Sequence, residues 1–150
     1  DKSLSLDKLR LGVKYLKEIL DNLNLKSFLK TSGGKGYHIC IPFKNNLTWK
    51  KFYKISEDIA NIIEKTHSEL FTTNNRKEKR KNKIFIDYLR NQKSATFVAP
   101  YSVRLRKNAP VSMPIAWNEL DKIKPNEITI YKAIKRLKKK DPWKEFFTSN

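Results

Sequence analysis

Apolar residues recur every three or four positions near the start of the chain, which is the spacing of an amphipathic helix. Ser3 or Ser5 would begin this helix, and Asp7 places an acid in its first turn. Its buried stripe is Leu6, Leu9, Val13, Leu16, Leu20 and Leu23. After a second capping residue, Thr48, another apolar stripe predicts a buried helical face made of Trp49, Phe52, Tyr53, Ile59, Ile62 and Ile63. A third, strongly basic helix is predicted over 129–140, with Ile130, Ile134 and Leu137 facing inward.

Strand patterns lie between these helices. Residues 27–31 read as a short strand, and 37–43 alternate so that His38 and Cys40 share a face. Further strands are predicted over 84–89 and 95–106, the second placing Ser102, Arg104 and Arg106 on one face. From 66 to 82 the pattern fails, which predicts a loop. This order of elements predicts an α+β domain with helices packed on a mostly antiparallel or mixed sheet.

Three of the four glycines fall at positions 33, 34 and 36, directly before the predicted strand at 37–43. Glycine accepts the left-handed backbone that turns successive N–H groups inward, so the loop predicts an anion-binding nest. Lys35 adds a positive charge and Ser32 a hydroxyl, and a phosphate is the ligand that fits. A plain tight turn explains the same glycines. A P-loop is excluded, because Leu29 and Gly36 stand where that motif requires glycine and serine or threonine.

The net charge of the 150-residue chain is its outlying property. Thirty-three Lys and Arg residues against fifteen Asp and Glu residues give a formal charge of +18. The charge favours a polyanionic partner, with nucleic acid first, while a lysine-rich proteome would produce the same count. No apolar run is long enough to span a membrane, which argues against a membrane partner. The single cysteine, Cys40, allows no internal disulfide and fits a reducing cytoplasm.

Asp87 is placed by this pattern in an otherwise apolar strand. A carboxylate there is costly to bury unless a cation meets it, so Asp87 requires either a basic side chain or a metal ion. Both explanations stay open on these residues alone.

Five blocks of sequence, in this order, resemble the polymerase domain of bacterial ligase D, a member of the archaeo-eukaryotic primase superfamily. The blocks are 30–38 (KTSGGKGYH), 86–91 (IDYLRN), 95–104 (ATFVAPYSVR), 109–114 (APVSMP) and 117–120 (WNEL), followed by Asp141-Pro142-Trp143. The resemblance runs from about residue 1 to residue 143. It implies a primase-polymerase-like fold and nucleotide transfer from NTPs to DNA 3′ ends in end-joining repair of double-strand breaks.

The resemblance also implies roles for individual residues. The incoming nucleotide would be bound by Ser32, Gly33, Gly34, Lys35, His38, Arg80 and Arg104. Asp87 would be a catalytic carboxylate that binds Mn²⁺ or Mg²⁺. Apart from the resemblance, the concentration of positive charge around residues 76–83 predicts that Arg76, Lys77, Lys79 and Lys81 contact DNA. A structural role as a hydrogen-bonded strand histidine is the alternative explanation for His38.

One departure from the family limits this interpretation. The family's other two metal carboxylates form an Asp-x-Asp motif, and the only acid-x-acid pair here is Glu119 and Asp121. On a helix these side chains would point to nearly opposite sides and could not share an ion. We therefore expect residues 1–150 to be a single partial domain, the C-terminal portion of a larger polymerase domain, inactive or nearly so alone.

The expected partners follow from this interpretation. They are DNA ends and NTPs, with a fused or associated ligase and a second copy pairing through an exposed sheet edge. The expected location is the cytoplasm, at the nucleoid. The alternative is a non-catalytic module that binds DNA ends or nucleotides.

Overall fold

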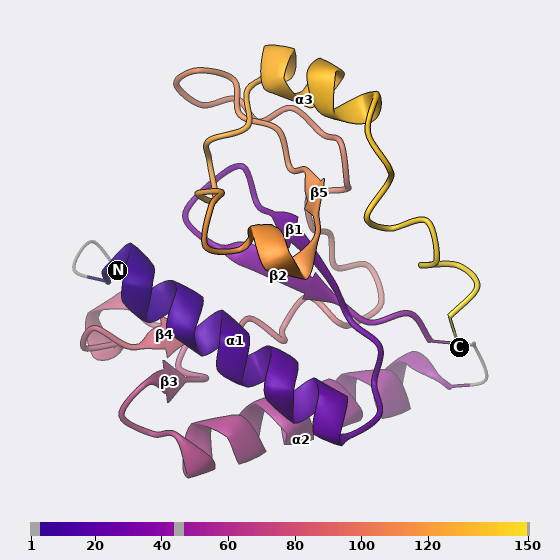
Figure 1. Ribbon diagram of the computed structural model, residues 1–150. Coiled ribbons are helices and arrows are strands. Elements are labelled where there is room, and N and C mark those ends of the chain that lie inside the picture. The colour runs from indigo at the N-terminus through magenta and orange to yellow at the C-terminus, as the bar shows by residue number, and fades with distance from the viewer. Residues whose placement is uncertain (1–3, 44–46, 150) are drawn as a thin grey trace. The chain divides into compact units, whose positions relative to one another are not determined.

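The computed structural model describes residues 4–43 and 47–149, and its contacts divide the chain into two compact units. The first unit contains Asp1–Leu16 and Asn45–Phe97, and the second contains Lys17–Lys44 and Val98–Asn150. The sequence of helix α1 (Leu6–Asn22) is divided between them after Leu16 (Figure 1 shows the helix).

The predicted first helix is present as α1. Ser5 begins it, because its Oγ accepts a hydrogen bond from the Lys8 amide at 3.1 Å, whereas Ser3 lies outside the described residues. Leu9, Val13 and Leu20 are buried as the spacing predicts. Leu23 follows the end of the helix and is 53% exposed, so the buried stripe stops at Leu20.

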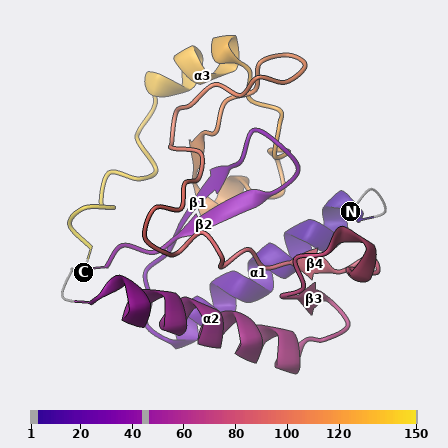
Figure 2. The same cartoon turned by 180° about the vertical axis from the view of Figure 1, so that it is seen from behind.

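The first unit holds a second helix, α2 (Trp49–Thr66), and two short parallel strands, β3 (Phe71–Thr72) and β4 (Ile84–Phe85) (Figure 2). Thr48 caps α2 as predicted, since its Oγ1 accepts from the Lys51 amide at 3.3 Å. Ala60 and Ile63 are buried, but Trp49 and Ile62 are 55% and 59% exposed. The prediction that the whole α2 stripe is core is therefore wrong at these two positions.

Two further predictions for this unit need correction. The strand expected over 84–89 covers only Ile84–Phe85, because its partner β3 ends at Thr72 and leaves the following backbone without a strand to pair with. The loop expected over 66–82 contains β3 and a 3₁₀ helix, η1 (Lys77–Lys79). A two-residue strand is too short to show the alternation by which strands are recognised in a sequence.

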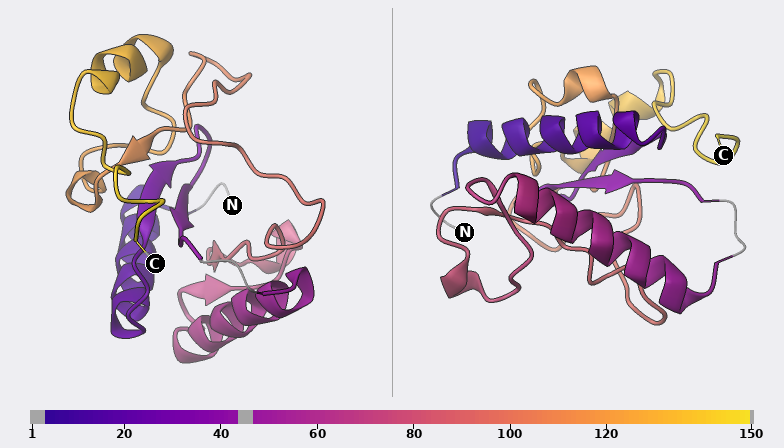
Figure 3. Two further views of the ribbon diagram at one scale, coloured as in Figure 1. Left: turned by 90° about the vertical axis from the view of Figure 1, so that its right-hand side faces the viewer. Right: turned by 90° about the horizontal axis from the view of Figure 1, so that it is seen from below.

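The second unit is built on a three-stranded antiparallel sheet in the order β2-β1-β5, with β1 (Phe28–Thr31) in the middle. Strand β2 (Tyr37–Cys40) and strand β5 (Pro114–Ile115) flank it (Figure 3). All four residues of β1 are buried. The register pairs Lys30 of β1 with His38 of β2, so these side chains lie on the same face of the sheet.

The predicted strand at 95–106 does not form as a regular strand. Part of this segment forms one arm of an irregular hairpin. Its two arms are joined by an isolated bridge between Val103 and Val111 and by a hydrogen bond from the Arg104 amide to the Pro110 carbonyl at 2.8 Å. Positive φ angles at Tyr101, Asn108 and Ala109 interrupt the extended backbone. We call residues 102–111 the arginine hairpin, because it carries Arg104 and Arg106.

The last helix, α3 (Ile130–Leu137), is shorter than predicted and turned the other way. Ile130, Ile134 and Leu137 are 40%, 54% and 62% exposed, so the expectation that they face inward is wrong. The inward positions are Ala133, which is buried, and Arg136, whose guanidinium donates two hydrogen bonds of 2.8 Å to the Glu119 carboxylate. This bidentate pair fixes the rotation of α3 about its own axis.

Within the residues the structure describes, no helix has the length and apolar character needed to cross a bilayer.

Candidate functional site

The glycine loop, residues 32–36, is closed by the side chain of Ser32. Ser32 Oγ accepts hydrogen bonds from the amides of Gly34 at 3.1 Å and Gly36 at 3.2 Å, while the Gly33 amide donates to the Pro125 carbonyl at 3.0 Å. The prediction of an open nest of successive N–H groups is therefore wrong, because three of these amides already have partners. The loop presents a rigid turn, with the exposed Lys35 at its tip.

Gly33 is required by a close approach of the arginine hairpin. Its φ is +64°, and a Cβ at this position would lie 2.6 Å from Cγ of Arg104. The Arg104 Nη1 donates to the Ser32 carbonyl at 3.3 Å. Arg106 lies beside the same loop, since its Cζ would be 3.6 Å from a Cβ on Gly34. The alternating pattern predicts both arginines on one face, and the family resemblance implies a role for Arg104 alone.

Lys30 lies beneath this loop as a fully buried cation. Its Nζ donates to the Val98 carbonyl and to Ser112 Oγ, both at 2.7 Å, and Ser112 Oγ donates to the Thr31 carbonyl at 2.8 Å. Burial lowers the pKa of Lys30 to about 8, opposed by Cys40 and helped by the positive Arg104. Ser112 is not a nucleophile activated by this lysine, because it is fully buried and directs its proton to a backbone carbonyl.

Lys30 lies in the first of the five sequence blocks, but no role was predicted for it. The sequence did contain a sign of this burial. Lys30 lies between Leu29 and Thr31 in a short predicted strand, and if that strand is central in a sheet, the lysine is buried and must find hydrogen-bond acceptors.

His38 lies opposite Lys30 on β2 and is half-buried. Burial lowers the pKa of His38 to about 4, and the positive charges of Lys30 and Arg104 act in the same direction. The imidazole is therefore neutral at pH 7 and can act as a hydrogen-bonding group but not as a cation. On the same strand, burial raises the pKa of the Cys40 thiol to about 11, which makes it a poor nucleophile.

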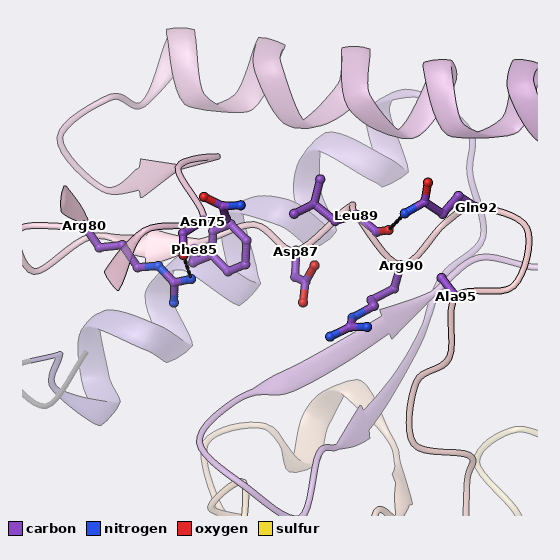
Figure 4. A pocket seen from close by; sticks show the side chains of 8 residues that line it. All are labelled: Asn75, Arg80, Phe85, Asp87, Leu89, Arg90, Gln92 and Ala95. Carbon is purple, nitrogen blue, oxygen red and sulfur yellow. Dashed lines mark hydrogen bonds between the residues drawn. The ribbon is translucent and has the colours of Figure 1, made fainter. Parts of the chain in front are cut away.

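Arg80 and Asp87, the predicted nucleotide-binding and metal-binding residues of the first unit, line one pocket. Its lining residues are Asn75, Arg80, Phe85, Asp87, Leu89, Arg90, Gln92 and Ala95 (Figure 4). The Arg80 guanidinium is held by hydrogen bonds to the carbonyls of Asn74 (3.3 Å) and Asn75 (2.8 Å), and it lies 3.9 Å from the centre of the Phe85 ring. Arg80 is thus fixed in place with one face against an aromatic ring.

Asp87 follows β4 by two residues and is exposed, which corrects its predicted place inside a strand. Its carboxylate points to the same side of the segment as the Arg90 guanidinium (Figure 4). None of the salt bridges among the described residues includes Asp87, so those residues provide no ion pair that would explain its charge.

A complete metal site is not formed by the described residues, among which no group of three or more His, Cys, Asp or Glu side chains could hold an ion. Asp87 offers a single carboxylate, whereas Mg²⁺ and Mn²⁺ sites need several oxygen ligands. Glu119 is engaged elsewhere, since it binds Arg136 and accepts from the Ala116 amide at 2.8 Å, and both contacts hold its pKa below the usual value. These residues fit one ligand of a metal site and no more.

The four residues predicted to contact DNA lie within η1 or directly beside it, and all are exposed. They are Arg76, Lys77, Lys79 and Lys81. The fifth cation of this loop, Arg80, differs from them because its side chain turns back onto the turn at 74–75. The loop therefore presents four positive charges to solvent.

The structure brings Ser32, His38 and Arg104 together around the glycine loop, and it brings Arg80 and Asp87 together in the pocket of the other unit. That both sets meet around one nucleotide stays a prediction.

Comparison with known proteins places these features in a family. A family model described as LigD, primase-polymerase domain, matches residues 1–143. The chain is 36% identical over 132 residues to the multifunctional non-homologous end joining protein LigD of Pseudomonas aeruginosa, covering 85% of this chain and 16% of that protein. It is 32% identical over 135 residues to the bifunctional non-homologous end joining protein LigD of Bacillus subtilis, covering 88% and 22%.

A solved structure shares the fold. The polymerase domain from Mycobacterium tuberculosis ligase D, in complex with DNA, superposes with a TM-score of 0.86 at 25% identity. The match covers 97% of this chain and 51% of that one, so the present chain spans about half of a solved polymerase domain and less than a quarter of the two LigD proteins. The predicted α+β fold is confirmed, and with 143 residues matched in sequence this chain belongs to the LigD primase-polymerase domain family.

Proposed function

We propose that this chain binds the triphosphate of an NTP on its glycine loop and serves DNA end-joining repair as part of a primase-polymerase domain. The observation that carries the proposal is the contact of Arg104 with the loop that holds Ser32 and Lys35. Two motifs far apart in the sequence form one cationic surface there. The family membership supports the same activity.

Each residue has a distinct part in this proposal. Lys35 and Arg104 neutralise phosphate charge, and the arginine fork can bind two phosphate oxygens at once. Ser32 shapes the loop and donates its hydroxyl proton to a phosphate oxygen. His38, neutral at pH 7, donates a ring N–H without adding charge. Arg80, whose guanidinium is held by the Asn74 and Asn75 carbonyls, is proposed as a further nucleotide-binding residue.

Asp87 is proposed as one ligand of Mn²⁺ or Mg²⁺. A divalent ion in such a site would neutralise charge on the reacting phosphate. The described residues supply one carboxylate of the several required, so we propose that the chain acts within a larger polymerase domain and transfers nucleotides slowly or not at all by itself. Additional carboxylates must come from outside these residues.

The proposal is tested by calorimetric titration of the chain with ATP in MgCl₂ or MnCl₂. Wild-type protein should bind, Lys35→Ala and Arg104→Ala should bind at least about tenfold more weakly, and the surface control Lys122→Ala should match the wild type. Absence of ATP binding by the wild type would refute the proposed site. Asp87→Ala should reduce the benefit of the divalent ion while leaving metal-free binding unchanged.

A non-catalytic DNA-end module is the second candidate, favoured by the exposed cationic loop at 76–81. Under this hypothesis DNA binding survives Asp87→Ala and Arg104→Ala but falls when the loop lysines are replaced. Primer extension by a longer polypeptide that includes the remaining carboxylates separates the two candidates, because only the polymerase hypothesis predicts loss of extension in Asp87→Ala. Pairing of two copies through a sheet edge, if it occurs, should be visible by sedimentation.

A further inference from the structure

We propose that Lys30 is a positioning residue whose buried ammonium group fastens the arginine hairpin to β1 and thereby sets where Arg104 meets a triphosphate. This inference rests on the proposed function, since it concerns the same site. Lys30 itself is fully buried, so its role would be to hold other residues in place and not to contact a nucleotide.

The contacts of Lys30 reach both segments from which the arginine hairpin emerges. One hydrogen bond, to the Val98 carbonyl, holds the chain that enters the hairpin, and the other, to Ser112 Oγ, holds the chain that leaves it. Both are 2.7 Å long and charge-assisted. One side chain on the central strand therefore secures both ends of the hairpin.

Ser112 links Lys30 to the base of the arginine hairpin and to β1 through further hydrogen bonds. The Ser112 hydroxyl donates to the Thr31 carbonyl, its amide donates to the Ser102 carbonyl at 2.9 Å, and its carbonyl accepts from the Tyr101 amide at 2.7 Å. Ser102 lies two residues before Arg104. A displacement of Ser112 is therefore passed to Arg104 through a short, hydrogen-bonded path.

Using a lysine for this connection has an unfavourable free energy of burial. Burying an ammonium group costs free energy that an apolar residue of the same length would not, and the lowered pKa of Lys30 is the sign of that cost. Methionine would fill the space but would leave the Val98 carbonyl and the Ser112 hydroxyl without their donor. The cost is explained if the position of the hairpin matters to function.

The charge of Lys30 should make the fastening sensitive to pH. Above about pH 8 the ammonium becomes a neutral amine, and its two hydrogen bonds lose their charge assistance. Two ionisable neighbours of Lys30, His38 and Cys40, do not titrate there, because their pKa values are about 4 and about 11. The third charged neighbour is the guanidinium of Arg104. A transition near pH 8 in the behaviour of the hairpin therefore reports Lys30.

The test compares Lys30→Met, which removes the donors, with Lys30→Gln, which keeps a donor without the charge, and with the surface control Lys122→Met. Two quantities are measured on the full chain: affinity for ATP in MgCl₂ between pH 6.5 and 9, and amide hydrogen exchange of the 98–112 segment at one fixed pH. We expect Lys30→Met to bind ATP roughly tenfold more weakly and to exchange faster in 98–112, with β1 still protected. Lys30→Gln should fall between Lys30→Met and wild type and should lose the weakening of ATP binding near pH 8.

The two measurements separate failure of this inference from failure of the proposed function. If wild-type protein binds no ATP, the proposed function is wrong, and hydrogen exchange alone then decides whether Lys30 holds the hairpin. If Lys30→Met and Lys30→Gln both match Lys122→Met in exchange over 98–112, or in ATP affinity where the wild type binds, the positioning role is overturned. Should Lys30→Met not fold, Lys30→Gln and the pH dependence of the wild type give the same decision.

Discussion

Arg104 and Ser32 are 72 positions apart in the chain and are joined by a hydrogen bond of 3.3 Å from the arginine Nη1 to the serine carbonyl. The guanidinium is thereby held at the edge of the glycine loop before any ligand binds. A pre-positioned cation loses less conformational freedom on binding an anion than a free one does.

Replacing Arg104 should therefore lower ATP affinity by more than the loss of one positive charge would explain. Arg104→Ala removes the charge and the fork, whereas Arg104→Lys keeps the charge but cannot reach two oxygens with a planar group. We expect ATP affinity to fall in the order wild type, Arg104→Lys, Arg104→Ala, with about tenfold or more lost in the alanine variant. Equal affinities for lysine and wild type in calorimetric titration would show that charge alone matters at this position.

Ser32→Ala should loosen the glycine loop. The substitution leaves the amides of Gly34 and Gly36 without the hydroxyl that accepts from both, in a position where Ser32 is only 8% exposed. The free energy of unfolding should fall by about 1–2 kcal/mol in urea titration. Ser68→Ala, at an exposed serine, is the control and should leave stability within about 0.5 kcal/mol of the wild type.

Gly12 lies where α1 touches the small parallel sheet of its own unit. A Cβ at Gly12 would be 2.2 Å from Cδ1 of Ile84 and 3.1 Å from the Phe71 ring. Alanine would normally stabilise a helix interior by up to about 1 kcal/mol relative to glycine, but overpacking costs about 1–3 kcal/mol, so Gly12→Ala should lower the melting temperature. The double variant Gly12→Ala with Ile84→Val removes the Cδ1 atom and should recover part of the loss; no recovery would place the strain elsewhere.

Acid should weaken the second unit through Glu119. Hydrogen bonds from Arg136 and from the Ala116 amide hold the pKa of Glu119 below its usual value. A carboxyl group whose pKa is lowered on folding stabilises the native state above its unfolded pKa, and this contribution is lost as pH falls through the folded pKa. The free energy of unfolding should thus drop by about 1–2 kcal/mol more in wild type than in Glu119→Gln between pH 6 and pH 3. The exposed Glu18→Gln should follow the wild-type profile.

The cationic loop should govern how DNA binding depends on salt. Replacing Lys77 and Lys79 with alanine removes two exposed charges without disturbing the contacts of Arg80. The slope of log affinity against log salt should become less steep by up to about 0.9 for each lysine that binds a phosphate. The matched double replacement of Lys50 and Lys51 on α2 should leave the slope unchanged, and an equal change in both variants would mean that the loop has no special role.

Much of the fold followed from local patterns. The periodic leucines of α1 and the cap at Thr48 depend on residues close in sequence, and both predictions agree with the structure. The orientation of α3 did not follow, because the side-chain pair that rotates the helix joins Arg136 to Glu119, seventeen residues away. The strand expected at 84–89 was too long for a similar reason, since its length is set by the short partner β3.

The sequence by itself determined the family, the helices and the residue types that could bind a triphosphate, because motif spacing and periodicity are properties of neighbouring residues. Only the tertiary structure decided that the amides of the glycine loop are occupied by Ser32, that Arg104 and Arg106 lie against that loop, and that Lys30 is buried beneath it. Each of these depends on which distant segment supplies a hydrogen-bond partner or excludes water, and that pairing is made only when the chain folds.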